Sequence, residues 1–370
     1  MFQKRRAIIT ITSIFLFVFL GLFVALMIFL RSSIVSDEKG IRYLVQPGAS
    51  IKSVSQDLYT QKIINHPFLF NMLVYLKGNK HELKAGDYLF RKGTTPLSLF
   101  NQITSGTGMF HYTFTIIAGW NFKHLREMLL NEPDLQHTSA TLSDAAIMSY
   151  LGAPALSPEG RFFPDTFYFV KGSSDLLLLK RSFQKMQNKL NIAWANREVG
   201  LPYLTQNEAL TVASLIEKET ALNKERPIIA GVILNRLKKD MLLQIDPTVI
   251  YAAGDHYNGT IYKTELLSNN PYNTYKHKGL PPTPIAIPSM DSINAAMHPQ
   301  HHNFYYFVVK NNTTEGGHQF SATLAEHNVA VLIARLNQPI EFFNNDLIKS
   351  YFLKIVFNSK DGLNAKTTDK

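Results

Sequence analysis

The N-terminal segment limits the possible architecture more than any other feature of this chain. Residues 7–30 form 24 consecutive positions without a charged side chain. As a helix this segment would be about 36 Å long, which is enough to span a bilayer with some tilt. Lys4, Arg5 and Arg6 precede it, so the positive-inside rule places residues 1–6 in the cytoplasm and the chain after residue 30 outside it. We therefore expect a single-pass protein of the plasma (inner) membrane with a periplasmic or otherwise extracytoplasmic body.

A cleaved signal peptide is the alternative interpretation of the same segment. Its apolar region would cover about 7–15 residues and would end at a small-residue cleavage site. Here the apolar region is longer and leads into Arg31, Ser32, Ser33 and Ile34. This pattern favours an uncut membrane anchor.

Composition limits the chemistry of the body. The chain has 370 residues and no cysteine, which excludes disulfides, a thiol nucleophile and a Cys-ligated metal site. The formal net charge of +10 suits anionic lipid headgroups or an anionic wall polymer. The expected topology separates the body from nucleic acid, so we expect no nucleic-acid partner. Residues 298–302 (HPQHH) lack matching carboxylates, so we expect neither a metal nor a cofactor.

The segment after the anchor indicates a small folded module. Residues 31–40 are predicted to form a polar linker, and residues 41–106 a module of alternating strand and helix signals. Strands are expected at 41–45 and 87–90. Helices are expected after the cap residue Ser50, over 67–77, and from Thr95 to Gly106.

The remaining chain indicates a mixed α+β fold rather than a doubly wound sheet. From residue 107 to 336, strand and helix signals alternate without strict βαβ repetition, with strands expected at 110–117 and 305–309. A helix is expected from Arg226, ending near Lys239. Residues 337–370 form a C-terminal extension, in which 347–357 are apolar enough to pack and the end from Ser359 resembles a disordered tail.

One helix places a carboxyl group in unusual surroundings. Thr205 and Glu208 form a capping box, which predicts a helix from about Gln206, and Glu217 lies about three turns into it. The residues that precede Glu217 at helical spacing are small or apolar: Leu210, Ala213 and Ser214. Partial burial would raise the pKa of Glu217 and keep it protonated for general acid catalysis.

Two other interpretations of this helix end stay open. Glu217 could form an ion pair with Lys218, Lys224 or Arg226. Glu219, two residues further on, is expected to point to another side of the helix, as a supporting or surface residue.

Six blocks resemble the YceG-like family of endolytic murein transglycosylases, in that family's order and spacing. The resemblance covers about residues 41–336, and the blocks are 159–166 (EGRFFPDT), 212–220 (VASLIEKET), 243–251 (LQIDPTVIY), 271–275 (PYNTY), 279–282 (GLPP) and 326–328 (EHN). Three positions depart from the family pattern: Ile245, Thr283 and Ser289.

The resemblance implies an activity and its participants. It implies that Glu217 is the catalytic acid and base, that peptidoglycan glycan strands are the substrate, and that peptidoglycan synthases are partners at the bilayer. It implies cleavage between N-acetylmuramic acid and N-acetylglucosamine within nascent strands, with 1,6-anhydro ends as products. It also implies a LysM-like module over residues 41–106, which either binds glycan or has only a structural role, and a catalytic domain over residues 107–336.

Polar residues of the same blocks are candidates for substrate binding. Gln244, Asn273, Thr274 and Tyr275 offer amides and hydroxyls for sugar groups, although residues 272–275 also fit a tight turn with buried rings. Asp246 is either a second carboxylate or the N-cap of a helix with proline in its first turn. The block containing Glu326 either supports the site through hydrogen bonds or only begins a helix.

The interpretation favoured by the sequence is a membrane-anchored lytic transglycosylase that limits strand elongation. A noncatalytic membrane-anchored peptidoglycan-binding scaffold is the alternative from another class. A muramidase that adds water is the third, and it needs a second functional carboxylate.

Overall fold

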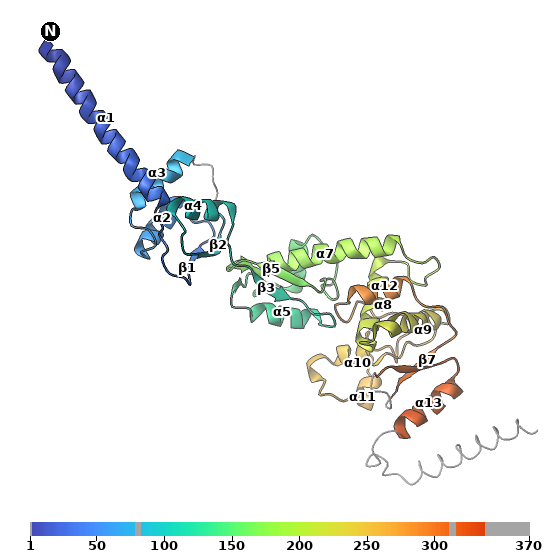
Figure 1. Ribbon diagram of the computed structural model, residues 1–370. Helices are drawn as coiled ribbons and strands as arrows, with labels where there is room; N and C mark the ends of the chain where they lie inside the picture. The colour runs from blue at the N-terminus through green and yellow to red at the C-terminus, as the bar shows by residue number, and fades with distance from the viewer. Residues whose placement is uncertain (1, 78–82, 311–315, 337–370) are drawn as a thin grey trace, which may run out of the picture. The chain divides into compact units, whose positions relative to one another are not determined.

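The computed structural model describes residues 2–77, 83–310 and 316–336 and forms two compact units (Figure 1). The first unit contains most of the chain up to Lys185. The second contains residues 118–121 and 159–161 together with the chain from Met186 on. Helices and short strands are mixed in both units, so the expected α+β class is confirmed. The expected packing of residues 347–357 and the tail from Ser359 lie outside the described residues.

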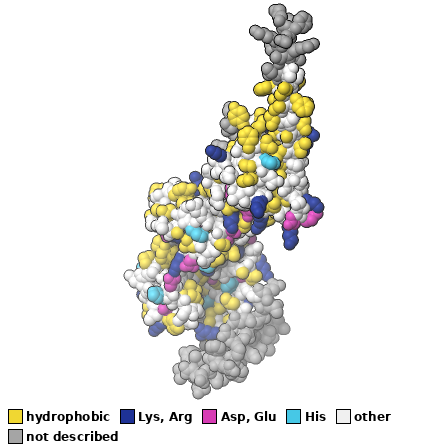
Figure 2. All heavy atoms as spheres, turned by 90° about the vertical axis from the view of Figure 1, so that its left-hand side faces the viewer, with side chains coloured by type: hydrophobic (Ala, Val, Ile, Leu, Met, Phe, Trp, Pro, Cys, Tyr) yellow, Lys and Arg dark blue, Asp and Glu magenta, His cyan; other side chains and the backbone are white. Residues whose placement is uncertain are grey.

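The N-terminal helix α1 (Phe2–Arg31) is long and apolar enough to cross a membrane, either as an anchor or as a signal sequence. Its segment Thr12–Arg31 has a mean hydropathy of 2.9. Figure 2 shows hydrophobic side chains gathered along it.

The module after α1 has two antiparallel strands with helices between and after them. In chain order its elements are β1 (Ile41–Val45), α2 (Ile51–Thr60), α3 (Pro67–Lys77), β2 (Gly86–Phe90) and α4 (Pro96–Ser105). Strands β1 and β2 pair from Ile41 opposite Phe90 to Val45 opposite Gly86. The expected caps are confirmed: Ser50 accepts from the Ser53 N–H, Thr95 forms a capping box, and Gly106 ends α4 with φ at 83°. Large aromatic residues fill the core, among them Phe70, Tyr88, Phe90 and Phe100.

Residues 31–40 differ from the expected polar linker. The Val35 side chain is fully buried in the module core. The Ile34 N–H donates to the Thr94 carbonyl at 2.8 Å, and the Gly93 N–H donates to the Val35 carbonyl at 3.0 Å. The segment is attached to the turn before α4 because its apolar residues complete the core.

The rest of the first unit contains small sheets covered by helices. Its elements are β3 (Tyr112–Thr115), α5 (Phe122–Leu130), β4 (Leu135–Gln136), α6 (Asp144–Tyr150), β5 (Thr166–Phe169), β6 (Ser173–Ser174) and the first half of α7 (Asp175–Ala195). Strand β3 is shorter than the predicted 110–117 and pairs antiparallel with β5. The short strands β4 and β6 are parallel.

The second unit is built around a packed set of helices. Its elements are the end of α7, α8 (Gln206–Glu219), η1 (Asn223–Glu225), α9 (Arg226–Lys238), α10 (Asp246–Ala253), η2 (Gly254–His256), α11 (Lys263–Leu266), α12 (Met290–Met297), β7 (Tyr306–Val309), β8 (His318–Ser321) and α13 (Leu324–Leu336). Helix α8 contacts both α9 and α12, and α13 packs on the antiparallel β7–β8 hairpin. Helices α8 and α9 begin where the sequence predicted, at Gln206 and Arg226.

Gly160 shows how sequence blocks far apart are joined in this unit. Its φ is +74°, a region that favours glycine, and an added Cβ would lie 2.5 Å from the Pro284 Cβ. The block around Gly160 therefore packs directly against the chain that follows the two prolines at 281–282.

Candidate active site

Helix α8 has two carboxyl groups at its C-terminal end. Thr205 and Glu208 cap its N-terminus, and every residue from Ala209 to Ile216 is buried. The helix ends at Thr220, whose backbone is extended. Glu217 and Glu219 therefore lie in the last turn of α8, and the buried residues before them hold this turn in place.

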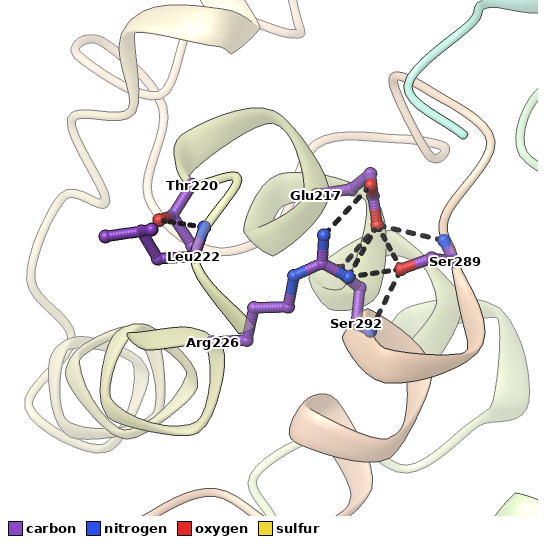
Figure 3. A network of polar contacts seen from close by, with 6 residues as sticks. All are labelled: Glu217, Thr220, Leu222, Arg226, Ser289 and Ser292. Carbon is purple, nitrogen blue, oxygen red and sulfur yellow. Dashed lines mark hydrogen bonds and ion pairs between the residues drawn. The ribbon is translucent and has the colours of Figure 1, made fainter. Parts of the chain in front are cut away.

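Glu217 lies in a network of hydrogen-bond donors (Figure 3). Its Oε2 accepts from the Ser289 N–H at 2.9 Å, from the Ser289 hydroxyl at 2.5 Å and from the Ser292 hydroxyl at 2.7 Å. The Arg226 guanidinium lies 3.3 Å from Oε2 and 3.4 Å from Oε1. Both charged side chains are only 8% exposed. Ser289, a departure from the family pattern, is thus a direct partner of Glu217.

These contacts correspond to the ion-pair interpretation of Glu217, with Arg226 as the cation. Lys218 instead reaches the Gly119 carbonyl at 3.4 Å. The carboxylate of Glu217 joins α8 to the start of α9 through Arg226 and to α12 through Ser289 and Ser292. The residues that precede Glu217 on α8 are apolar or small as expected, but its carboxylate oxygens face hydrogen-bond donors.

Glu219 lies in the lining of a cavity of about 520 Å³, on another side of the helix from Glu217. Burial, followed by the charge of Asp246, raises the pKa of Glu219 to about 8, although the charge of Arg236 opposes the shift. A carboxyl group with this pKa is protonated at neutral pH. The cavity is lined by Glu219, Arg236, Leu243, Gln244, Asp246, Tyr275, Tyr306, Phe307, Val308, Val309, His318, Leu324, His327 and Asn328.

Asp246 is in the cavity lining but is not the helix cap that one interpretation expected. Helix α10 begins at Asp246 itself, and Ile245 occupies the N-cap position without a side-chain hydrogen bond. Pro247 lies in the first turn, as predicted. The Asp246 carboxylate accepts a hydrogen bond from the Tyr275 hydroxyl. Burial, followed by this carboxylate, raises the pKa of Tyr275, so the phenol stays a donor.

Arg236 is a cavity residue that no sequence motif indicated. It donates to the carbonyls of Tyr305 at 2.6 Å, Leu243 at 2.6 Å and Leu242 at 3.1 Å. These bonds hold the segment that presents Gln244, whose φ is +50°. Gln244 also lines the cavity. Arg236 lies in the last turn of α9, where a cation also suits the helix dipole, so its sequence position alone gives no signal of a site.

Asn273 and Thr274 are buried and do not belong to the cavity lining. The Asn273 amide donates to the carbonyls of Glu265, Leu266 and Ser268. The Thr274 hydroxyl accepts from the Ile245 N–H at 2.9 Å. These bonds correspond to the tight-turn interpretation, and they fix the backbone next to Tyr275 and Asp246.

The block that contains Glu326 combines a helix start with two cavity residues. Glu326 accepts from the Ala322 and Thr323 N–H groups, a capping arrangement at the start of α13. The next two residues, His327 and Asn328, line the cavity. The His327 ring stacks on Tyr306 at 5.2 Å, and burial, followed by the charge of Arg236, lowers the pKa of His327.

A second polar network fixes the chain that follows Glu219. Glu225 accepts from the His318 N–H at 2.8 Å and contacts His318 Nδ1 at 2.8 Å. The Thr220 hydroxyl donates to the same carboxylate at 3.2 Å. Burial alone would raise the pKa of Glu225, but the hydrogen bonds from His318 hold it below its ordinary value.

Two of the histidines at 298–302 have structural partners. His302 Nε2 lies 2.8 Å from the Ile228 carbonyl, and His301 lies 2.6 Å from Glu198. Within residues 2–77, 83–310 and 316–336, no group of three or more His, Cys, Asp or Glu side chains is placed to hold a metal ion.

Comparison with known proteins identifies the family of the chain. The model of the YceG-like family matches residues 43–332, and the chain belongs to this family. A Bacillus subtilis (strain 168) protein named endolytic murein transglycosylase is 30% identical over 302 residues, which cover 77% of this chain and 82% of that protein.

Two further proteins are similar to this chain. A Streptococcus pneumoniae (strain ATCC BAA-255 / R6) protein of the same name is 26% identical over 71% of this chain, and the match spans 53% of that longer protein. The crystal structure of a YceG-like protein from Listeria monocytogenes is 27% identical, with a TM-score of 0.47, and the match covers 79% of this chain and 99% of that one.

Proposed function

We propose that this chain is a peptidoglycan lytic transglycosylase whose cavity around Glu219 is the catalytic site. The observation that carries this proposal is the position of the Glu219 carboxyl group in the lining of a polar cavity, together with Gln244, Asp246 and Tyr275. Burial raises the pKa of this group. A group protonated at neutral pH can act as a general acid there. Membership of the YceG-like family and the names of its relatives supply the substrate, the glycan strands of murein.

Glu219 is better placed for this role than Glu217. The oxygens of Glu217 accept from two serines and lie against Arg226, so a proton donor there would first have to leave its partners. Glu219 faces open space together with Gln244, Asp246 and Tyr275. We assign Glu217 the role of fixing the end of α8. Glu217 as the catalytic acid, the assignment from the sequence, is the alternative.

The reaction needs one group that first gives and then takes a proton. Glu219 protonates the glycosidic oxygen as the bond from muramyl C1 to that oxygen breaks. Its carboxylate then removes the proton of the muramyl 6-hydroxyl, whose oxygen bonds to C1 and closes the 1,6-anhydro ring. The substrate supplies its own nucleophile at high effective concentration, so water is not consumed. Gln244 and Tyr275 offer an amide and a hydroxyl to the sugars.

Hydrolysis is the second candidate because Asp246 supplies another carboxylate in the same cavity. A muramidase would use it as nucleophile or to activate water. The engagement of Asp246 with the Tyr275 hydroxyl favours a supporting role instead.

Product chemistry tests the proposal. Purified glycan strands are digested in ¹⁸O-water, and the new ends are analysed by mass spectrometry. Unlabelled 1,6-anhydromuramyl ends at internal positions are expected. Label at the new anomeric carbon would identify a muramidase, and intact strands would favour the noncatalytic scaffold.

The proposal also includes a location and partners. We propose that α1 is an uncut anchor with its N-terminus in the cytoplasm, and that the body cuts nascent strands beside peptidoglycan synthases. Residues 41–106 are proposed as a LysM-like module. The charge pattern around α1 and the family membership support this arrangement.

A further inference from the structure

Helix α3 is apolar on both of its faces. Phe70, Leu73 and Val74 pack into the module core. The opposite face carries four large apolar side chains in water, at the spacing i, i+4, i+7 and i+8: Phe68, Met72, Tyr75 and Leu76. Phe68 is 76% exposed and Tyr75 is 73% exposed. A helix that is apolar all round is normally covered on both sides or in contact with lipid.

The end of α1 is built into the same module, beside the start of α3. Leu26 and Phe29 are buried, and Phe29 belongs to the module core. The Phe29 ring contacts the ring of His66, the residue before α3, with centroids 6.1 Å apart. Figure 1 shows α3 beside this end of α1. This contact holds the start of α3 beside the last turn of α1, at the same height along the axis of α1.

If α1 spans the bilayer, this height along α1 corresponds to a depth in the membrane. The uncharged segment of α1 ends at Leu30, so Phe29 lies at the edge of the hydrocarbon layer and Arg31 among the headgroups. The exposed face of α3 begins at the same depth. Tyrosine favours this boundary, and the exposed cations Arg31 and Lys77, at the ends of α1 and α3, suit headgroup phosphates.

We infer that α3 is an interfacial helix whose Phe68, Met72, Tyr75 and Leu76 enter the extracytoplasmic leaflet of the bilayer that α1 spans. The inference rests on the proposed anchor. It predicts a second membrane contact for the module, one helix across the bilayer and one along its surface. Two contacts would limit rotation of the module about the axis of α1, whereas a single tether would not.

The absence of cysteine makes a direct test simple. Single-cysteine variants of the full chain are labelled with an environment-sensitive nitrobenzoxadiazole dye and reconstituted in vesicles of phosphatidylcholine and phosphatidylglycerol. Met72→Cys and Tyr75→Cys report on α3, Phe19→Cys reports on the anchor, and Val199→Cys, at a position 95% exposed in the second unit, is the water control. Lipids with a nitroxide near the headgroup act as quenchers.

The inference expects blue-shifted emission and lipid quenching at Met72→Cys and Tyr75→Cys, with neither at Val199→Cys. Water-like emission at both α3 sites, with Phe19→Cys quenched, would overturn the inference and leave the anchor intact. Water-like emission at Phe19→Cys as well would overturn the anchor and the inference together. Blue shift without lipid quenching, accompanied by disulfide dimers that unlabelled Tyr75→Cys forms under oxidation at low but not at high lipid-to-protein ratio, would show that a second copy covers α3 and would also refute the inference.

Discussion

At the scale of single residues, the two carboxyl groups at the end of α8 are separated by geometry. Two positions along an α-helix differ by about 200°, so Glu217 and Glu219 face nearly opposite directions. One meets donors from α9 and α12, and the other meets the cavity. Burial in the second arrangement penalises the charged form and raises the pKa of Glu219.

Glu219→Gln should keep the fold and lose strand cleavage by roughly 10²–10⁴-fold, because an amide cannot give and recover a proton. Glu217→Gln should retain more activity once correctly folded. Strand cleavage and thermal unfolding of both variants provide the comparison. If Glu219→Gln cleaves strands near the wild-type rate while folded Glu217→Gln does not, the sequence-based assignment of Glu217 as acid is correct.

Glu217→Gln should instead lower the free energy of unfolding by about 3–5 kcal/mol, since it leaves a buried guanidinium without a charged partner. Adding Arg226→Met removes that unpaired charge and should recover part of the loss. Denaturant titrations of the two single variants and the double variant measure the coupling. Additive losses would show that the ion pair contributes nothing to stability.

Turnover should fall as pH rises through about 8, because Glu219 must be protonated to act as acid. The charge of Asp246 contributes to the raised pKa, so Asp246→Asn should move this fall to lower pH. Rates measured from pH 6 to about 9.5, with folding monitored in parallel, test both expectations. An alkaline limb that does not move in Asp246→Asn would show that another group controls it.

The same shift predicts how stability depends on pH. The pKa of Glu219 rises from an ordinary 4.5 to about 8 on folding, so between these values the folded chain binds a proton that the unfolded chain has lost. This contribution to stability is complete below the lower value and is lost as pH rises through the upper one. Glu219→Gln should therefore be more stable than wild type near pH 9, by a few kcal/mol at about 1.4 kcal/mol per pKa unit, and similar near pH 4. Chemical unfolding of both proteins at both pH values provides the measurement. An equal difference in the free energy of unfolding at the two pH values would contradict the raised pKa.

At the scale of elements, the end of α8 is held by partners from other segments. Glu225 joins Thr220, directly after α8, to His318 on β8. An added Cβ on Gly317 would lie 2.6 Å from Glu225 Oε1, so glycine is needed for this close approach. The network fixes the backbone that presents Glu219.

Glu225→Gln should destabilise the chain by about 1–3 kcal/mol, because a buried hydrogen-bond partner is left unsatisfied. It should also lower kcat more than it changes KM, since Glu219 loses its position. Folding lowers the pKa of Glu225, so its carboxylate stabilises the folded chain at pH values above the unfolded pKa. This stabilisation fades as pH falls through the folded pKa. The difference from wild type should thus shrink in acid.

Asn191→Gln, at an exposed position of α7, is a suitable control for this variant because it also changes one polar side chain but lies outside the Glu225 network. Unfolding curves and steady-state kinetics of both variants provide the measurement. An unchanged kcat in Glu225→Gln would show that Glu225 does not position Glu219.

At the scale of the whole molecule, α1 combines a length suited to a bilayer with an end embedded in the module core. Such an attachment differs from a flexible tether. Residues 32–35 continue from the helix into the packed module without a free segment.

A reporter fused after Lys370 should be active only outside the cytoplasm, because Lys4, Arg5 and Arg6 precede α1. The chain should stay in the membrane fraction after a high-salt wash, which removes proteins held by charge alone. Fractionation with a salt-sensitive peripheral protein as control provides the measurement. A released, shortened form would indicate a signal peptide, and cytoplasmic reporter activity would exclude murein as substrate.

The sequence by itself determined the local elements of this protein. The length of the apolar helix α1 follows from an uncharged run of residues. The caps at Ser50, Thr95 and Thr205 and the helix starting at Arg226 follow from capping and periodicity, which depend on residues a few positions apart. The family followed from blocks in register. The polar residues Gln244, Asp246 and Tyr275 were selected from those blocks and lie together in one cavity.

Only the tertiary structure decided which carboxyl group faces that cavity. Glu217 and Glu219 occupy the same turn of α8, and their environments come from Ser289, Arg236 and other residues far along the chain. The same holds for Asn273, buried by carbonyls of its own turn, and for Val35, which completes a core instead of lying in a linker. Burial and hydrogen bonding depend on contacts between distant segments, and no local pattern of residues contains them.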